Sequence, residues 1–189
     1  MKVGNLINVI DIEATCWDYP APEKIATTIE IGITVVEMDT IKINNSTSVY
    51  ISVDSDQISS FCTQLTGITP ELIAAEGIPF MEAINLLKRT HRIHNRPWIS
   101  WGDYDINQLR RDCEKNNLIY EKVFYPRHAN LKLWFSLMYG LTKELSVGKA
   151  LEYINSPFEG SPHSGKDDAY NIAKIFKRIR EDFKNVVLI

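Results

Sequence analysis

The fold is decided by the stretch Ile10-Asp11-Ile12-Glu13-Ala14-Thr15-Cys16, in which an apolar run ends in two carboxylates separated by one residue. Residues 8–10 are typical of a buried strand, and the alternation of side chains along a strand places Asp11 and Glu13 on the same face. Two neighbouring negative charges repel, and a divalent cation that prefers oxygen ligands, such as Mg²⁺ or Mn²⁺, relieves the repulsion. A strand end exposed to water explains the pattern equally well, so both interpretations stay open.

Two further acidic motifs follow downstream. Residues 98–102 are typical of a short buried strand, and Asp103-Tyr104-Asp105 comes directly after it, before a helical pattern. In the third motif, His163 precedes Asp168 by five residues at the start of a final amphipathic helix. An aspartate in the first turn of a helix also acts as a cap or interacts favourably with the helix dipole, so neither motif alone establishes a catalytic site.

In this order, the three motifs resemble the exonuclease motifs of the DEDDh family, the DnaQ-like branch of the ribonuclease-H-like exonucleases. The residues that match the four acids and the histidine of the family are Asp11, Glu13, Asp105, Asp168 and His163. The resemblance covers nearly the whole chain. It implies a single exonuclease domain over residues 1–189, with an α/β ribonuclease-H-like fold in which helices flank a mixed five-stranded sheet.

Within that family, the motifs look most like the exoribonuclease branch that includes the eukaryotic histone-mRNA 3'-end exonuclease and bacterial KapD-like proteins. The stretch from Phe61 to Ile68, FCTQLTGI, also resembles that branch, where it lines the pocket for the terminal nucleotide. The resemblance therefore implies substrate contacts from Leu65, Thr66 and Ile68. It also implies that Ala14 and Thr15 hold the terminal 3'-hydroxyl.

Several neighbours of these motifs leave alternatives open. Trp17 either stacks on a base, an interaction worth roughly 1 to 3 kcal/mol per base, or packs in the core. Tyr104 stands where relatives often carry Trp, Met or Phe. Asp103 competes with Asp105 for a ligand role, and the family pattern selects Asp105. Asp167, next to the third motif's acid, is interpreted as a helix cap.

The resemblance implies metal-assisted hydrolysis of a phosphodiester at two divalent ions. Asp11 is expected to bridge the ions, Glu13 and Asp168 to complete the ligands of the first, and Asp105 to serve the second. A set made only of carboxylates favours Mg²⁺, with Mn²⁺ as a substitute. The unperturbed pKa of histidine is near 6.5, so a neutral His163 is available at pH 7 as the general base.

Three functional hypotheses follow. The leading one is a 3'-to-5' exoribonuclease that acts on single-stranded or overhanging RNA 3' ends and releases nucleoside 5'-monophosphates. The second is the same catalytic centre acting on DNA. RNA is favoured on the branch resemblance alone, because no residue that senses the 2'-hydroxyl is identifiable. The third is a non-catalytic module that binds 3' ends, and the presence of all four acids and the histidine argues against it.

Composition agrees with one intracellular domain. The chain has 189 residues, of which 44% are hydrophobic and 24% charged, enough to bury a core without metal or disulfide support. Three widely spaced cysteines, Cys16, Cys62 and Cys113, argue against a disulfide framework and for a reducing compartment. No apolar run approaches the length of about 18 residues that a membrane span needs. We expect a cytoplasmic protein without membrane contact, and the resemblance leaves a homodimer open.

The charge of the chain does not by itself indicate nucleic-acid binding. The formal net charge is -3, and an acidic catalytic centre helps explain this value. Arg127, His128 and Lys132 are candidate phosphate contacts, because they bracket the entry to a helix at Asn130. The other basic residues are expected on solvated helix faces.

Alternating periodicities predict the elements that carry these motifs. An antiparallel meander is expected from strands over residues 5–13, 29–38 and 48–53, with turns or irregular segments at 38–40 and 44–46. Further short strands are expected at 98–102 and 122–124. Helices are expected over residues 70–76, 79–87, 104–117, 131–139, 147–154 and 167–183. Residues 157–165, which include His163, are expected to be irregular.

Overall fold

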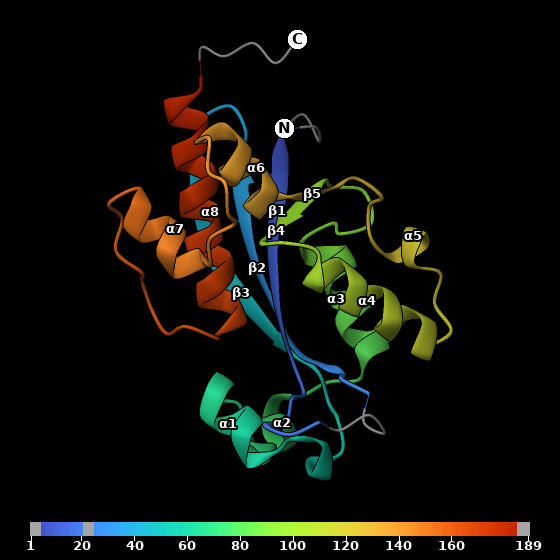
Figure 1. The fold of residues 1–189 in the computed structure, drawn as a ribbon. Helices are drawn as coiled ribbons and strands as arrows, with labels where there is room; N and C mark the ends of the chain where they lie inside the picture. Colours follow the sequence, from blue (N-terminus) through green and yellow to red (C-terminus); the bar gives the residue numbers. More distant parts are fainter. Residues whose placement is uncertain (1–4, 21–24, 185–189) are drawn as a thin grey trace.

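The computed structural model describes residues 5–20 and 25–184. A mixed sheet of five strands in the order β3-β2-β1-β4-β5 forms its centre (Figure 1). The strands are β1 (Leu6–Ala14), β2 (Thr28–Glu37), β3 (Ile43–Tyr50), β4 (Trp98–Ser100) and β5 (His128–Asn130). The first three strands form an antiparallel meander, and β4 and β5 add in parallel on the other side of β1. The predicted α/β fold with a mixed five-stranded sheet is confirmed.

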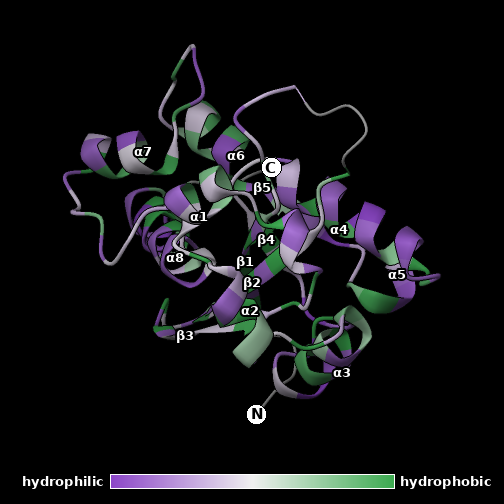
Figure 2. Cartoon of the chain, turned by 90° about the horizontal axis from the view of Figure 1, so that it is seen from below, coloured by the Kyte–Doolittle hydropathy of each residue, from purple (hydrophilic) through white to green (hydrophobic). Residues whose placement is uncertain are grey.

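Helices cover both faces of the sheet. They are α1 (Ser60–Thr66), α2 (Pro70–Glu76), α3 (Phe80–Thr90), α4 (Tyr104–Lys115), α5 (Tyr120–Val123), α6 (Leu131–Met138), α7 (Val147–Tyr153) and α8 (Gly165–Asp182), with a 3₁₀ turn, η1, at Ser55–Gln57. Figure 2 shows α6, α7 and α8 on one side of the strands and α3, α4 and α5 on the other. The short helices α1 and α2 lie beyond one end of the sheet (Figure 1).

The central strand β1 is apolar on both faces because a helical layer covers each. Val9 packs in the cluster with Ile172 and Phe176 of α8, whereas Ile10 packs in the opposite cluster with Leu87 of α3 and Leu109 of α4. All six side chains are at most 3% exposed. Burying a side chain of this size stabilises the fold by about 1.5 to 3 kcal/mol, so these two layers hold β1 and its acids in a fixed position.

A smaller third cluster fastens α1 and α2 to the end of the sheet. It includes Ile29 of β2 together with Cys62, Ile68 and Ile73. Helix α2 begins at Pro70 after the cap residue Thr69, as the sequence predicts. Helix α1 was not predicted, because its seven residues carry a single buried side chain and hence no apolar periodicity.

The third predicted strand is wrong in its position. Residues 44–46 belong to β3 instead of a turn, and β3 ends at Tyr50. This edge strand is rich in Asn, Ser and Thr, so it shows little apolar alternation. Its extent is set by antiparallel pairing with β2. The turn expected at residues 38–40 is present.

The predicted strand at residues 122–124 is also wrong. Residue Val123 ends helix α5, and the fifth strand is β5, which pairs in parallel with β4. Strand β5 has three half-buried residues, too few for a periodic pattern. It is recognised as a strand by its hydrogen bonds with the neighbouring β4. Within the described residues, no helix combines the length and the apolar character needed to cross a membrane.

Candidate active site

The four predicted acids come together from three elements. Strand β1 carries Asp11 and Glu13, α8 carries Asp168 in its first turn, and α4 carries Asp105 in its first turn. Carboxylate oxygens of Asp11, Glu13 and Asp168 all lie within 4.8 Å of one another. Asp105 is 4% exposed, and its Oδ1 accepts a hydrogen bond of 3.1 Å from the backbone N–H of Ile12, between the two acids of β1.

Two glycines allow α8 to approach the sheet closely enough to complete this cluster. A Cβ on Gly32 of β2 would lie 2.0 Å from the carbonyl carbon of Gly165, the first residue of α8. A Cβ on Gly165 would lie 3.2 Å from the backbone oxygen of Asp11. The absence of side chains at these two positions therefore sets how near Asp168 comes to β1.

His163 lies on the loop that precedes α8 and lines the same cleft as the acids. Its side chain is exposed, and its backbone has a positive φ of 61°. Its N–H donates a hydrogen bond of 2.7 Å to Oδ2 of Asp168. Because a left-handed conformation is unfavourable for a histidine, this hydrogen bond helps to hold the loop in place.

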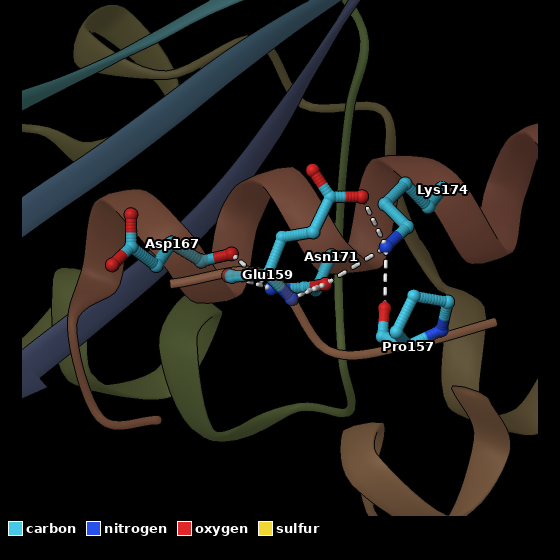
Figure 3. A network of polar contacts seen from close by, with 5 residues as sticks. All are labelled: Pro157, Glu159, Asp167, Asn171 and Lys174. Carbon is cyan, nitrogen blue, oxygen red and sulfur yellow. Dashed lines mark hydrogen bonds and ion pairs between the residues drawn. The ribbon is translucent and has the colours of Figure 1, made fainter. Parts of the chain in front are cut away.

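A polar network fastens the beginning of that loop to α8 (Figure 3). Asn171 is fully buried, and its amide exchanges hydrogen bonds of 3.1 and 2.8 Å with the backbone N–H and C=O of Glu159. The same amide donates to the backbone oxygen of Asp167, and Lys174 donates to the oxygen of Pro157. The loop is therefore held by α8 at both ends.

The cleft between these residues has a volume of about 540 Å³. Its floor is acidic, and its walls include aromatic and apolar side chains, among them Trp101, Tyr104 and Phe158. Tyr104 is 55% exposed. Lys132 lies on the wall and forms an ion pair of 3.3 Å with Glu144. The cleft thus combines an acidic floor, an accessible aromatic ring and a lysine.

Burial and mutual repulsion make the four acids hard to ionise in the absence of a cation. Burial and the charge of Asp168 raise the pKa of Glu13 to about 8, and the pKa of Asp11 lies well above its usual range for the same kinds of reason. Burial raises the pKa of Asp105 to about 7, although the hydrogen bond from Ile12 favours the charged form. Burial likewise raises the pKa of Asp168 to about 6, against the hydrogen bond from His163.

This donor set fits a divalent cation. Among the described residues, the ion pairs leave all four acids without a lysine or arginine partner. Clustered carboxylates that no protein cation neutralises are the ligands that hard divalent ions prefer. The arrangement can therefore hold metal through Asp11, Glu13, Asp168 and Asp105.

The two competing acids have other partners. Asp103 accepts a hydrogen bond of 3.0 Å from the side chain of Asn130, at the start of α6. Asp167 accepts a hydrogen bond of 2.9 Å from the backbone N–H of Ser161, in the loop before α8. Asp103 thus stabilises the start of α6, whereas Asp167 is not the helix cap that the sequence suggested. The cap position of α8 is Ser164, and Asp167 lies in the first turn and holds the preceding loop.

The residues expected to contact the terminal nucleotide gather where α1 meets the end of β1. The thiol of Cys62 contacts the backbone oxygen of Ala14, and Ser59 donates a hydrogen bond of 2.6 Å to the backbone oxygen of Cys16. The exposures are 6% for Ala14, 1% for Thr15, 38% for Leu65 and 2% for Ile68, and Thr66 and Trp17 are half-buried. None of these six residues lines the acidic cleft as the structure describes it.

Two of these side chains are already engaged within the protein. Thr15 Oγ1 accepts a hydrogen bond of 3.0 Å from the backbone N–H of Thr27. Ile68 packs in the third cluster, beneath the surface. Their roles at the nucleotide stay predictions, and Leu65 offers the most exposed side chain of the group.

One candidate phosphate contact is unsuited to that role. The ring of His128 packs against Trp98 with centroids 4.3 Å apart, and its Nε2 lies 2.8 Å from the hydroxyl of Ser100. Burial lowers the pKa of His128 to about 4, so the imidazole is neutral at pH 7. Arg127 is exposed, but only Lys132 of the three candidates lines the cleft.

The sequence analysis assigned no role to four residues that lie next to the acids. Glu30, Gly32, Gly165 and Asn171 lie against the site without belonging to the acidic cluster. A signal for Glu30 was visible, because it interrupts the apolar run of β2 with a charge. Gly165 belongs to the third motif, but its contact with Gly32 could not be foreseen, since the two residues come from elements far apart in the chain.

Comparison with known proteins agrees with this site. The family model RNase_T, described as exonuclease, matches residues 8–176. The 3'-5' exonuclease Snipper of Drosophila melanogaster is 26% identical over 204 residues, which cover 96% of this chain and 72% of Snipper. Human 3'-5' exoribonuclease 1 is 28% identical, with 93% of this chain and 52% of the relative covered. The chain therefore spans about half the length of that human relative.

The fold is shared with solved nucleases. The nuclease domain of 3'hExo, a DEDDh family member solved with bound rAMP, superposes with a TM-score of 0.84 at 25% identity, covering 96% of this chain and 94% of that domain. A structure described as 3'-end specific recognition of histone mRNA stem-loop by 3'-exonuclease gives a TM-score of 0.80 at 26% identity, covering 95% and 65%. Since the matched span includes every one of the assembled acids, this chain belongs to the exonuclease family as one of its DEDDh members.

Proposed function

We propose that this chain is a metal-dependent 3'-to-5' exoribonuclease that releases nucleoside 5'-monophosphates from single-stranded or overhanging RNA. The observation that carries the proposal is the convergence of Asp11, Glu13, Asp105 and Asp168, from three elements, on the cleft that His163 lines. The choice of RNA is supported by the exoribonuclease names of the relatives and by the histone mRNA stem-loop in a similar structure.

Magnesium is the proposed cofactor, as two ions for which manganese substitutes. Asp11, Glu13 and Asp168 would hold the first ion, and Asp11 and Asp105 the second. When bound, such ions stabilise negative charge on the phosphate and make water a better nucleophile. The fit rests on carboxylates that are half-buried or, for Asp105, buried, that repel one another, and that no protein cation pairs with among the described residues.

His163 is the proposed general base. Its imidazole lines the cleft beside the acids, and it would take a proton from the attacking water while the phosphodiester bond is cleaved. The hydrogen bond from its N–H to Asp168 fixes the backbone from which this side chain extends. The backbone of the base is therefore fixed relative to the acidic cluster.

Lys132 and Tyr104 are the proposed contacts for the nucleic acid beyond the scissile bond. The Lys132 ammonium can exchange its ion pair with Glu144 for a phosphate oxygen, because both partners are partly exposed at 31% and 46% of their side chains. The exposed ring of Tyr104 offers a surface on which a base stacks. Both residues lie in the wall of the cleft, next to the acids.

Degradation of matched 5'-labelled RNA and DNA strands, in Mg²⁺ and in EDTA, tests the proposal. The expected result is a ladder that shortens from the 3' end in Mg²⁺, faster for RNA, with nucleoside 5'-monophosphates as the products. Asp11→Asn should abolish the ladder, whereas the control Asp54→Asn changes an exposed acid away from the cleft and should keep it. Intact strands in both Mg²⁺ and Mn²⁺ would refute the catalytic function, and faster DNA degradation would refute the choice of RNA.

A further inference from the structure

Glu30 is a buried acid beside the site that has no part in the cluster of metal-binding candidates. It lies on β2 opposite Glu13 of β1 and is 1% exposed. Its Oε2 accepts a hydrogen bond of 3.0 Å from the N–H of Gly165, and its Oε1 accepts one of 3.1 Å from the N–H of Lys166. The hydroxyl of Ser48 on β3 donates to the same carboxylate.

These contacts join α8 to the sheet at the first turn of the helix. The first N–H groups of a helix have no partner within the helix, and two of them are satisfied here by a side chain from another element. Hydrogen bonds to an ionised carboxylate are about twice as strong as those between neutral groups. The first turn, which also contains Asp168, is thereby fixed to the strand that lies next to Asp11 and Glu13.

The position of Glu30 is electrostatically unfavourable, because it adds a negative charge beside the acidic cluster. Its charge adds to the burial and the charge of Asp168 that raise the pKa of Glu13. A buried carboxylate next to an acidic cluster disfavours ionisation of that cluster. A charged residue at this position therefore has to provide something that a neutral side chain does not. What it provides is a charged acceptor for two backbone N–H groups at once, at the crossing where Gly32 and Gly165 bring the backbones together.

We propose that Glu30 is a positioning residue of the catalytic centre, which holds the first turn of α8 in the register that places Asp168 against Asp11 and Glu13. It acts through Asp168 and, by way of the hydrogen bond from the N–H of His163, through the base. The consequence for catalysis rests on the proposed nuclease function. The consequences for metal affinity and for order in the first turn of α8 do not.

The diagnostic change is Glu30→Gln, which keeps the shape of the side chain. An amide has one acceptor oxygen, so its NH₂ group would face an N–H of either Gly165 or Lys166, and at least one of the two hydrogen bonds would be lost. The control is Thr34→Ala on the same strand. Thr34 is also fully buried and bonds to β3 through Ser46, and within the described part of the chain its side chain forms no hydrogen bond with α8.

Three measurements decide the proposal. Hydrogen exchange of the amides in the first turn of α8, calorimetric titration with Mn²⁺, and steady-state kinetics on the single-stranded RNA substrate are compared between wild type and the two variants. For Glu30→Gln we expect faster exchange at Gly165 and Lys166, weaker Mn²⁺ binding, and a kcat lower by about 10- to 100-fold, because small displacements of catalytic groups cost that much. KM should stay within about twofold, since no substrate contact is removed.

For Thr34→Ala we expect a lower Tm with unchanged exchange at the first turn of α8, unchanged Mn²⁺ binding and unchanged kcat. A Glu30→Gln protein that loses only Tm, as the control does, would overturn the proposal. If the wild type degrades no nucleic acid, the proposed function fails. The role of Glu30 is then still tested by amide hydrogen exchange in the first turn of α8 and by Mn²⁺ binding. Should Glu30→Gln not fold, Glu30→Asp keeps the carboxylate but shortens the side chain by one methylene, and unchanged exchange at Gly165 and Lys166 in that variant would refute the role.

Discussion

Asp168 and His163 are joined by a hydrogen bond of 2.7 Å, from the backbone N–H of the histidine to Oδ2 of the aspartate. One carboxylate therefore belongs to the acidic cluster and also closes the loop before α8. The spacing of five residues is the distance along the chain that this closure requires, given a left-handed turn at His163 and a helix that begins at Gly165. The spacing that marks the third motif in the sequence thus has a structural cause.

Replacing His163 by alanine should remove the general base while leaving the acidic cluster intact. We expect kcat to fall by about 10²- to 10⁴-fold, the usual contribution of a positioned base. The backbone hydrogen bond to Asp168 is independent of the side chain, so Mn²⁺ binding measured by calorimetry should be unchanged. His94→Ala changes an exposed histidine that does not line the cleft and serves as the control. A His163→Ala enzyme of normal kcat would exclude the histidine as the base.

Asp11→Asn should stabilise the metal-free protein although it abolishes catalysis. Repulsion from Asp105, Asp168 and Glu13 raises the pKa of Asp11 in addition to burial, and the amide removes that repulsion. We expect the Tm in EDTA to rise by about 2 to 4 °C, the shift that 1 kcal/mol produces in a chain of this size. Thermal unfolding with and without Mg²⁺ measures it, and added Mg²⁺ should raise the Tm of the wild type more than that of the variant. A lower Tm in EDTA would contradict the repulsion.

Metal-free protein should lose stability as pH rises from about 4 to about 8. The pKa values of Glu13, Asp105 and Asp168 are about 8, 7 and 6 in the folded protein, all above those of an unfolded chain, near 4. The folded state therefore holds more protons over this range, and its free energy of unfolding falls with rising pH. Urea unfolding of wild type and Asp11→Asn in EDTA at several pH values checks this. If the free energy of unfolding of the wild type rose with pH relative to that of the variant, the prediction would be contradicted.

Binding of Mg²⁺ should release protons near neutral pH, for the same reason. Carboxylates that are partly protonated in the metal-free protein must lose their protons to act as ligands. We expect the affinity to rise between pH 6 and pH 8, and the heat of binding at pH 7 to depend on the ionisation enthalpy of the buffer. Calorimetry in two buffers of different ionisation enthalpy measures the number of protons released. Equal heats in both buffers would show that the acids are already ionised.

Gly32→Ala should separate α8 from the sheet. The new Cβ would lie 2.0 Å from backbone atoms of Gly165, which no side-chain rotation relieves, so the helix must move. We expect activity and Mn²⁺ affinity to fall together with Tm. Gly148→Ala is the control for Tm, because a Cβ there meets no atom within 4 Å. Since Gly148 lines the cleft, Thr34→Ala on the same strand as Gly32 is the control for activity and Mn²⁺ affinity. Full activity in Gly32→Ala would mean that the contact between α8 and β2 does not position Asp168.

Lys132→Ala should weaken substrate binding more than catalysis. The ammonium lies in the wall of the cleft, apart from the acidic cluster, so its loss removes attraction for a phosphate without touching the acids. We expect KM to rise several-fold at low salt, with little change in kcat and a smaller dependence of KM on salt. Lys177→Ala, on an exposed face of α8, is the control. A salt dependence of KM equal to that of wild type would remove Lys132 from the binding surface.

The motifs could be predicted because each depends on a local pattern. Asp11 and Glu13 share a face because side chains alternate along a strand, and the start of α4 after β4 follows from an apolar run and a helical period. The short or polar elements could not be predicted in the same way. Strand β5 and the first half of β3 form because a neighbouring strand supplies their hydrogen bonds, so their own residues carry no sufficient pattern.

By itself, the sequence determined the chemical groups of the site, the order of the motifs and the mixed sheet flanked by helices, because these depend on residue type and on spacing along the chain. Only the tertiary structure decided how near the four acids lie, which side chains line the cleft and what holds α8 in place. The contacts of Glu30 with Gly165 and of Gly32 with the same residue join positions more than 130 residues apart, as the separation of 135 between Glu30 and Gly165 shows. Such contacts arise from the packing of a helix on a sheet, which leaves no periodic trace in either segment.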